Sequence, residues 1–422
     1  MAAVLVCLSA SLDAKNGEAA MTPRLLALAC ASSLCLIACQ QPGNASGQSA
    51  TAAPDADAPA TGAQSAGTPA EDIAASDMPP FTATEVAKFD EPWAMAFLPD
   101  GRLLVTEKKG ALKLVDLATG EVGDITGVPK VDYGGQGGFG DIALHPDYAD
   151  NHVVYVSYAE AGDDDTRGGA VARGTLALDD SGGGKLEGLE VIWRQVPKVA
   201  GRGHYGHRLL FGSDGKLWIT SSERQKFDPA QDMQSNLGKM IRLDDDGSVP
   251  ADNPFADQGG VAAQVWSLGH RNLLGIDFDA QGRLWEVEMG PKGGDELNLI
   301  ERGGNYGYPI VSNGDHYDGR DIPDHDTRPE FDAPKAWWNP VISPSSLLIY
   351  SGGMFPDWKG DALIGGLSSQ SLVRVVFDGD EAREAQRFDM GQRIRAVEQG
   401  PDGAVWLLED GTGARLLKLT PR

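Results

Sequence analysis

A strand–turn–strand pattern recurs along this chain, and it limits the possible folds more than any other feature. In the clearest copy, the apolar run 209–211 leads into the turn Ser213-Asp214-Gly215 and then into the alternating run 216–220. Such turn chemistry between β-rich runs predicts a β-hairpin. Related hairpins are expected in the segments 93–106, 138–157, 274–288, 346–365 and 394–408.

Each hairpin is followed by a further alternating segment, such as 112–115 or 372–376. Six units of about four strands each predict an all-β fold, a six-bladed β-propeller. We expect 81–89 and 416–419 to complete one blade between them, which closes the ring and leaves only short edges. A seven-bladed propeller or a β-sandwich is the alternative. The 54 glycines show no collagen period and agree with many tight turns.

The formal net charge of −25 argues against a nucleic-acid partner. It also means that an anionic ligand would need a local basic cluster to hold it against the overall field. Every cysteine precedes residue 40, so the body of the chain has no disulfide and must be stabilised by a large core. The four are Cys7, Cys30, Cys35 and Cys39.

Residues 1–39 are predicted to be a targeting segment whose true start is Met21. A basic entry at Arg24 precedes the apolar run 25–38, which is too short to span a bilayer. The sequence LIAC at 36–39 resembles the lipobox of bacterial lipoproteins, in which Cys39 would be lipidated. An ordinary cleaved signal is the alternative. Because Gln40 rather than Asp follows, analogy favours a periplasmic, lipid-anchored protein at the outer membrane of a Gram-negative bacterium.

Residues 40–80 are predicted to be a disordered linker. Ala, Gly, Ser, Thr, Pro, Gln and Asp dominate this stretch, and it has too little apolar surface to order itself. The propeller domain is therefore expected to occupy residues 81–422.

The repeats resemble one another, but the residues just before the inner strand of several blades differ from repeat to repeat. In a propeller these entry loops converge on the central channel, where ligands bind. A guanidinium group can hold a carboxylate through two hydrogen bonds, so these entry-loop residues suit a small ligand with several carboxylates. For any single arginine, the alternative is a salt bridge that ties blades together. The entry-loop residues are Gln136, His204, Arg271, Asn272, Arg393 and Arg395.

We also expect Glu223 and the run 288–296 at the mouth of the channel, because each follows the second strand of a hairpin. His207, by contrast, is expected to pack beside its inner strand, because Arg208 and Leu209 begin that strand.

Several runs together resemble the quinoprotein glucose/sorbosone dehydrogenase family, in particular its soluble aldose sugar dehydrogenase branch. The likeness extends from about Pro92 to Pro421. The most specific runs are GGQGG at 134–138, GHYGHRL at 203–209, LGHRN at 268–272, MGPKGGDELNLI at 289–300, GGNYGYP at 303–309 and QRIR at 392–395.

This resemblance implies an enzyme that binds pyrroloquinoline quinone (PQQ) and Ca²⁺ and oxidises aldose sugars at the anomeric carbon to lactones. His204 matches the general base, and Glu223 matches an acid that supports it. Arg271 would also stabilise charge that develops on the quinone. The positions that match cofactor contacts are Gln136, His204, Arg271, Asn272, Arg393 and Arg395. Backbone carbonyls of Gly290 and Pro291 match the cofactor calcium site, and Glu296 with Tyr306 matches a neighbouring calcium site.

Two positions depart from the family pattern. Ser368 stands where the family's glucose dehydrogenases carry a cofactor-binding lysine, and the supporting acid is Glu223 rather than an aspartate. Both departures bear on cofactor affinity and sugar preference.

Two other classes of function remain as alternatives: a calcium-dependent lactonase and a non-catalytic binding lipoprotein. The expected partners are an aldose, an electron acceptor that the sequence does not identify, and a membrane reached only through the lipid anchor; a monomer is expected.

Overall fold

The computed structural model describes residues 68–70 and 78–422, which are almost entirely strand and loop. This confirms the prediction of an all-β fold. Over these ranges, helix is limited to α1 (Tyr148–Asn151) and to short 3-10 segments. Those segments are η1 (Asp228–Gln231), η2 (Ala256–Gln258), η3 (Ala262–Gln264), η4 (His325–Thr327) and η5 (Pro356–Trp358).

The predicted hairpins are all present, each extended into an antiparallel sheet. One sheet contains β3 (Pro92–Phe97), β4 (Leu103–Glu107), β5 (Ala111–Val115) and β6 (Val122–Thr126), and β6 pairs in parallel with the outer strand of the next group. That group is β7 (Phe139–Leu144), β8 (Val153–Ala161), β9 (Arg167–Leu178) and β10 (Gly184–Arg194). A separate sheet follows, with β11 (Gly206–Phe211), β12 (Leu217–Ser221), β13 (Lys239–Leu243) and β14 (Val265–Leu268).

The remaining strands continue this order along the chain. The next sheet contains β15 (Leu273–Phe278), β16 (Leu284–Glu288), β17 (Asp295–Leu299), β18 (Ala336–Trp338) and, at its edge, β1 (Thr68–Pro69). It is followed by β19 (Pro344–Ile349), β20 (Ala362–Gly366), β21 (Ser371–Asp378) and β22 (Glu381–Asp389). The last sheet has the order β2 (Phe81–Asp90), β25 (Thr412–Pro421), β24 (Val405–Glu409) and β23 (Ile394–Gln399).

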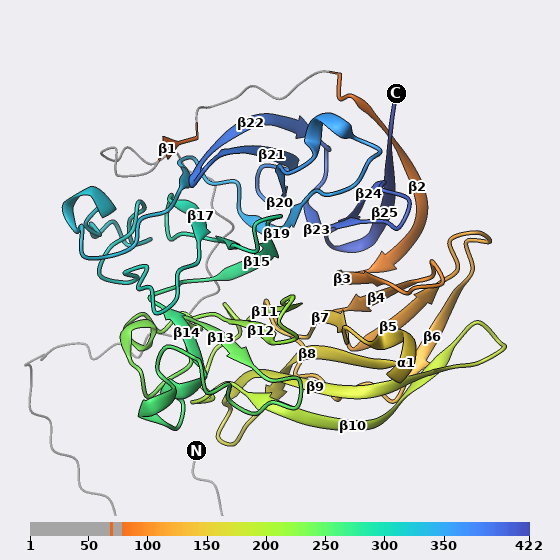
Figure 1. Cartoon of the computed structure of the whole chain (residues 1–422), viewed down its shortest axis with the longest axis horizontal. Helices are drawn as coiled ribbons and strands as arrows, with labels where there is room; N and C mark the ends of the chain where they lie inside the picture. The colour runs from red at the N-terminus through yellow and green to blue at the C-terminus, as the bar shows by residue number, and fades with distance from the viewer. Residues whose placement is uncertain (1–67, 71–77) are drawn as a thin grey trace, which may run out of the picture. The chain divides into compact units, whose positions relative to one another are not determined.

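The first strand of each hairpin lies innermost, and these strands form a closed circuit. Strands β3, β7, β11, β15, β19 and β23 each contact the next in this order, and β23 contacts β3 again. In Figure 1 the sheets accordingly follow one another in chain order around a common centre. Sheets arranged in this way are the architecture of a β-propeller.

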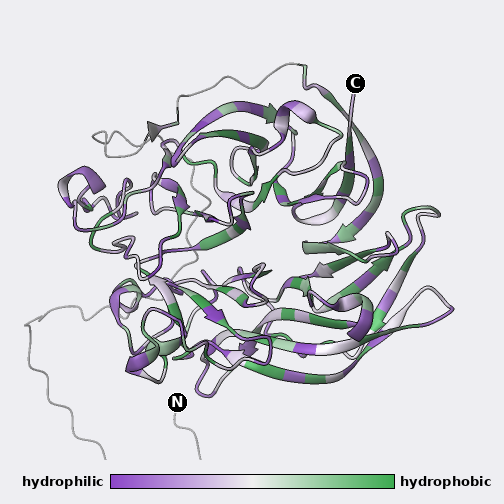
Figure 2. Ribbon diagram, viewed as in Figure 1, coloured by the Kyte–Doolittle hydropathy of each residue, from purple (hydrophilic) through white to green (hydrophobic). Residues whose placement is uncertain are grey.

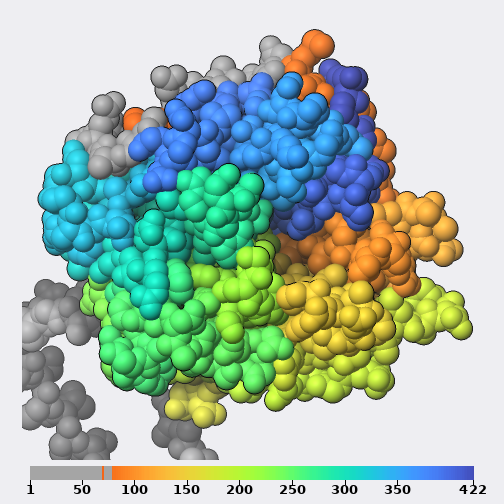
Figure 3. Space-filling model, viewed as in Figure 1, coloured from red at the N-terminus to blue at the C-terminus, as the bar shows by residue number. Residues whose placement is uncertain are grey.

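The two ends of the described chain share one sheet, as the sequence predicted. Strand β2 pairs antiparallel with β25, with Phe81 opposite Pro421 and Ala87 opposite Leu416. In Figure 3 the dark blue C-terminal residues lie beside the orange residues of the first described strands. This pairing joins the last sheet to the start of the domain: β25 is paired on both sides, and β2 forms the outer strand of the sheet.

The core lies between neighbouring sheets. Apolar and polar residues alternate along many strands, as the green and purple bands of Figure 2 show. One apolar cluster joins Tyr155 and Trp193 of the β7–β10 group to Leu217 and Ile241 of the next sheet. Burial of such faces removes apolar surface from water and stabilises the ring without disulfides.

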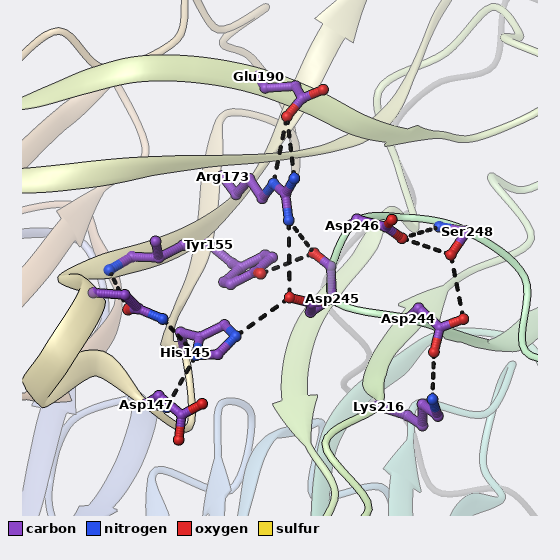
Figure 4. A network of polar contacts seen from close by, with 12 residues as sticks. His145, Asp147, Tyr155, Arg173, Glu190, Lys216, Asp244, Asp245, Asp246 and Ser248 are labelled. Carbon is purple, nitrogen blue, oxygen red and sulfur yellow. Dashed lines mark hydrogen bonds and ion pairs between the residues drawn. The ribbon is translucent and has the colours of Figure 1, made fainter.

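A polar network also joins these two sheets (Figure 4). The backbone carbonyl of Asp245, on the turn after β13, accepts hydrogen bonds from Tyr155 Oη at 2.8 Å and from Arg173 Nη1 at 3.1 Å. The carboxylate of Asp245 also lies 3.4 Å from His145 Nε2. Because side chains of one group hold a turn of the next, the network fixes how the two sheets sit against each other.

Residues 68–70 fall within the predicted linker, yet β1 pairs in parallel with β18, with Thr68 opposite Ala336. The prediction of a disordered linker does not anticipate this pairing. The targeting segment, Cys39 and the remainder of the linker up to residue 77 lie outside the described residues. Among the helices of the described ranges, none has the length and apolar character needed to cross a membrane.

Candidate active site

A cavity of about 290 Å³ lies where the entry loops of the inner strands meet. The chain segments that form it are far apart in the sequence, and ring closure brings them together. Eight of the residues singled out from the sequence line this cavity: Gln136, His204, Arg271, Asn272, Gly290, Pro291, Arg393 and Arg395.

His204 lies on the loop that enters β11 and is held there by two neighbours. Its backbone N–H donates to Gln136 Oε1 at 2.7 Å, and its Nδ1 lies 2.5 Å from Glu223 Oε1. His204, Gly206 and His207 have left-handed φ values of 47°, 84° and 77°, which turn the loop into the strand. Both His204 and Glu223 are buried.

Glu223 is the prediction that the structure refines most. It follows β12 as predicted but does not line the cavity; it lies behind His204 and is almost completely buried. Its second oxygen, Oε2, accepts the backbone N–H groups of Lys226 at 2.5 Å and Phe227 at 3.0 Å. Its own N–H donates to the carbonyl oxygen of Arg271 at 2.9 Å, which links β12 to the next sheet.

The hydrogen bond to Glu223 determines which ring nitrogen of His204 carries the proton. An ionised carboxylate accepts the Nδ1 proton, which leaves Nε2 with a lone pair. Burial lowers the pKa of His204, and the nearby Arg271 cation lowers it further. Burial would raise the pKa of Glu223, but the hydrogen bond from His204, the nearby positive charges and the backbone N–H of Phe227 together outweigh this effect and lower it. At neutral pH the pair is therefore a neutral base oriented by an anion.

Three arginines supply positive charge to the cavity. Arg271 is buried and donates through Nη1 to the carbonyl oxygens of Met289, at 2.8 Å, and Gly290. Arg393 Nε and Arg395 Nε each lie 2.9 Å from a different oxygen of Asp410.

Asp410 belongs to the same sheet as the two arginines that it bonds. Burial would raise its pKa, but the charges of Arg395 and Arg393 lower it to about 2. Because Asp410 directly follows β24, this ion pair lies within one sheet and does not tie two blades together.

The sequence analysis missed further cavity residues. Lys108 lines the cavity directly after β4 and donates to the carbonyl oxygen of Gly135 at 3.1 Å. Burial, with help from the charge of Arg395, lowers its pKa. Lys108 follows the second strand of its hairpin, as Glu223 does, so the same sequence signal could have identified Lys108. Ser368, in contrast, is bonded to the carbonyl oxygen of Val341 at 3.4 Å, and its neighbour Leu367 lines the cavity instead.

His207 packs as expected, with its ring stacked on Tyr205 at 5.2 Å, but both residues also line the cavity. Burial and the Arg224 charge lower the pKa of His207 to about 3, so this imidazole is neutral. Among the described residues, four buried polar atoms of the cavity lining have no protein hydrogen-bond partner, so they are available to a polar ligand or to water. They are Tyr205 Oη, His207 Nε2, Arg271 Nε and Asn272 Oδ1.

Glu296 and Tyr306 belong to a different site, a buried acidic cluster on β16 and β17. Glu288 is opposite Glu296 in the strand pair, and Glu286 is opposite Asn298. Ligand atoms of His270, Glu286 and Glu288 lie within 4.8 Å of one another.

Tyr306 packs beside the acidic cluster, with its ring stacked on His270 at 4.6 Å, and its hydroxyl donates to the carbonyl oxygen of Leu299. Burial raises the pKa of Glu286 and of Glu288 well above the ordinary value, and the neighbouring carboxylates raise both further. Glu286 Oε1 and Asn298 Oδ1 find no partner in the described part of the chain. Oxygen donors of this kind are what Ca²⁺ prefers.

The calcium carbonyls predicted at the cavity are only partly available. The Gly290 carbonyl accepts a hydrogen bond from Arg271. The carboxylate of Asp295 accepts N–H groups from Gly290 at 3.0 Å, Ile342 at 2.8 Å and Ser343 at 2.6 Å. Among the described residues, these bonds occupy lone pairs that a calcium ion at Gly290 and Pro291 would use.

Comparison with known proteins places this arrangement in a family. A family model described as Glucose / Sorbosone dehydrogenase matches residues 89–418. The chain is 38% identical over 343 residues to the aldose sugar dehydrogenase YliI of Escherichia coli (strain K12), covering 79% of this chain and 91% of that protein.

Solved structures give the same result. The soluble aldose sugar dehydrogenase (Asd) of Escherichia coli in its apo-form matches with a TM-score of 0.76 and 36% identity, over 81% of this chain and 100% of that chain. The PQQ-bound form of aldose sugar dehydrogenase (Adh) from Streptomyces coelicolor matches with a TM-score of 0.67 and 29% identity, over 81% and 98% of the two chains.

Proposed function

The chain belongs to the glucose/sorbosone dehydrogenase family, and from this premise we propose that it is a PQQ-dependent aldose sugar dehydrogenase. It would oxidise the anomeric carbon of aldoses and release lactones. The observation that carries the proposal is the His204–Glu223 pair in a cavity whose lining also includes Arg271, Arg393 and Arg395.

The cavity residues fit PQQ, a planar quinone with several carboxylates. Arg395 on β23 and Arg393, which directly precedes that strand, present guanidinium groups two positions apart, and Arg271 presents a third. The unpartnered Nε of Arg271 and Oδ1 of Asn272 add a donor and an acceptor. When bound, PQQ supplies the redox chemistry, because it accepts a hydride from the anomeric carbon.

His204 would remove the second hydrogen of the reaction as a proton. Its Nε2 takes the proton of the anomeric hydroxyl, while Glu223 holds the Nδ1 proton and stabilises the imidazolium that forms. The sugar thereby loses one hydride and one proton, and its anomeric carbon becomes the lactone carbonyl. Burial, and after it the charge of Arg271, keep the pKa of His204 low, so the imidazole is unprotonated and can accept the proton.

Calcium would be held in the acidic cluster. Glu286, Glu288 and Glu296 are buried carboxylates, and buried carboxylates need either protons or a cation. A second calcium at Gly290 and Pro291 stays a prediction, because further oxygens would have to come from the bound cofactor.

For the architecture we propose a six-bladed propeller. The circuit of inner strands from β3 to β23 and the shared β2–β25 sheet support this number. For the location we propose the predicted lipid anchor at Cys39, with a periplasmic, monomeric body. If Cys39 is lipidated, Cys39→Ala should move the protein from the membrane fraction to the soluble fraction; unchanged partitioning would contradict the anchor.

Reconstitution tests the proposed activity. Purified protein is incubated with PQQ and Ca²⁺, its quinone absorption is recorded, and a panel of aldoses is added with a dye as the artificial acceptor. We expect aldose-dependent dye reduction that requires PQQ. His204→Ala should still bind PQQ but reduce it about 10²–10⁴-fold more slowly, the usual contribution of a positioned base. Hydrolysis of lactones without PQQ, or no reaction with any aldose, would refute the proposal.

A further inference from the structure

A second cavity, the far cavity, lies at the other end of the channel from the active-site cavity, and its volume is about 420 Å³. Residues before or near the start of the inner strands line the active-site cavity, whereas later residues of the same six strands line the far cavity. The proposed reaction does not use it. Its lining segments are 95–97, 141–144, 208–211, 275–277, 346–348 and 396–399.

Arg208 separates the two cavities. Its Nε donates to the carbonyl oxygen of Leu274 at 2.6 Å, and its Nη2 donates to that of Ser345 at 2.5 Å. Its guanidinium group lies 4.1 Å from the ring centre of Trp93, a residue that lines the active-site cavity. On the side of the far cavity, Nη1 of Arg208 lies 3.5 Å from Asp141 Oδ1. The positive charge of Arg208 is therefore already paired.

Two other carboxylates of the far cavity have no such partner. Asp277 on β15 accepts the N–H of Phe278 at 2.8 Å and that of Ile349 at 2.7 Å. Glu398 on β23 accepts the N–H of Gln399 at 2.9 Å through Oε1. Within the described part of the chain, neither carboxylate forms an ion pair within 4 Å.

Burial makes these two negative charges costly. It raises the pKa of Glu398 to about 8, and the charges of Asp277 and Asp141 contribute to this shift. Burial also raises the pKa of Asp277 to about 6. A carboxylate in such a place holds either a proton or a cation.

Ser346 adds a neutral group between the two carboxylates. It belongs to β19, which lies between β15 and β23 in the circuit of inner strands. Ser346 lines the far cavity and is only 4% exposed, yet its Oγ has no hydrogen-bond partner among the described residues. Buried hydroxyls are nearly always bonded, so this one is available to a ligand in the far cavity.

The arrangement favours an extended organic cation over a metal ion. Among the described residues, the acidic or imidazole ligand atoms that gather within 4.8 Å in threes are those at His270, not those of the far cavity. The carboxylates of the far cavity are therefore too widely spaced to bind one bare ion together. Leu347 and Leu348 of β19 also line the cavity and give it an apolar wall. Two unpaired carboxylates with an apolar wall between them match a methylene chain that carries an ammonium group at each end.

We propose that the far cavity binds a linear aliphatic diamine as its dication. One ammonium group pairs with Asp277 and the other with Glu398, and Ser346 Oγ accepts a further N–H. The methylene chain lies against Leu347 and Leu348. The inference is independent of the proposed function, because this site requires neither PQQ nor a sugar.

Isothermal titration calorimetry of the full chain with 1,4-diaminobutane tests this proposal. The protein is titrated free and PQQ-loaded, because PQQ fills the active-site cavity. We expect one diamine per chain with the same affinity in both forms, and binding of 1-aminobutane, which has one ammonium group, about 10-fold weaker or less. Affinity for the diamine should rise from about pH 6 to about pH 8. Over that range Glu398, which faces Asp141, Asp277 and Arg208, loses its proton, whereas an alkylamine stays charged up to about pH 10.

Three variants locate the binding. Glu398→Gln keeps the size of the side chain and should weaken diamine binding about 10- to 150-fold, the scale of a charged hydrogen bond, and Ser346→Ala should weaken it about 2- to 12-fold. Ser346→Ala also serves as the second test if Glu398→Gln does not fold. Glu381→Gln is the matched control, because Glu381 is exposed at the start of β22, and it should bind as the wild type does. An equal loss in Glu381→Gln, equal affinities for the two amines, competition by PQQ, or tighter binding of Mg²⁺ at the same residues would overturn the proposal.

Discussion

Replacing Glu223 by glutamine tests the proposed mechanism most directly, because the change keeps the size of the side chain. Oε1 of Glu223 accepts the Nδ1 proton of His204, and Oε2 accepts the N–H groups of Lys226 and Phe227. Glutamine has only one acceptor oxygen. The two backbone donors outnumber the single imidazole donor, so the amide oxygen should turn toward the 226–227 loop.

The amide NH₂ would then face Nδ1 of His204, which must become the acceptor. This moves the imidazole proton to Nε2, where it blocks removal of the anomeric proton. The extra backbone bond favours this arrangement by about 0.5–1.5 kcal/mol, and loss of the carboxylate removes about 1.5–3 kcal/mol of hydrogen bonding to the imidazolium. The barrier should rise by about 2–4.5 kcal/mol, which slows the step about 30- to 2,000-fold.

Stopped-flow reduction of the PQQ-loaded protein by an aldose measures this step without the acceptor. We expect Glu223→Gln to bind PQQ with wild-type affinity and to be slow only in this half-reaction. Glu91→Gln is the matched control, because Glu91 also lines the cavity but accepts its hydrogen bond from Tyr133. A wild-type rate for Glu223→Gln, or an equal loss in both variants, would refute the tautomer argument.

Three further predictions concern the cofactor, the pH profile and the metal. Arg395→Ala should weaken PQQ binding by about 1.5–3 kcal/mol, the scale of a charged hydrogen bond, as measured by titration of the quinone absorption; unfolding with unchanged PQQ affinity would instead assign Arg395 to holding Asp410. Because the pKa of His204 is lowered in the folded protein, the rate of sugar oxidation should stay constant near neutral pH and decline only below about pH 6.5. The unfolded chain protonates His204 more readily than the folded protein does. The free energy of unfolding should therefore also fall as the pH drops below about 6.5. Removal of calcium should lower Tm, and more so as pH rises, because the raised pKa values of Glu286 and Glu288 stabilise the metal-free fold only while the carboxyls are protonated; a Tm independent of chelator at every pH would contradict a cation in the acidic cluster.

Local features were predictable from the sequence. The alternation of apolar residues and the turn at 213–215 specify β11 and β12, because strand period and turn chemistry depend only on neighbouring residues. The place of His204, just before an inner strand, also follows from the repeat. The residue types at these positions, together with the resemblance, indicated which loops would converge.

Contacts between distant segments needed the tertiary structure. Glu223 lies behind His204 rather than at the cavity mouth, because its backbone is bonded to Arg271 of the next sheet. The registers that place Glu288 opposite Glu296 depend on how the hairpins fold onto each other.

The sequence by itself determined a ring of hairpins and the chemistry carried on its entry loops, since both arise from local periodicity and residue type. Only the tertiary structure decided that Lys108 and His207 line the cavity, that one carboxylate holds both His204 and Phe227, and that Phe227 stands exposed with a left-handed backbone. The reason is physical: such contacts depend on ring closure and on loop conformations that no single residue's propensity specifies, and a strained, half-exposed phenylalanine contradicts the preference of its own sequence.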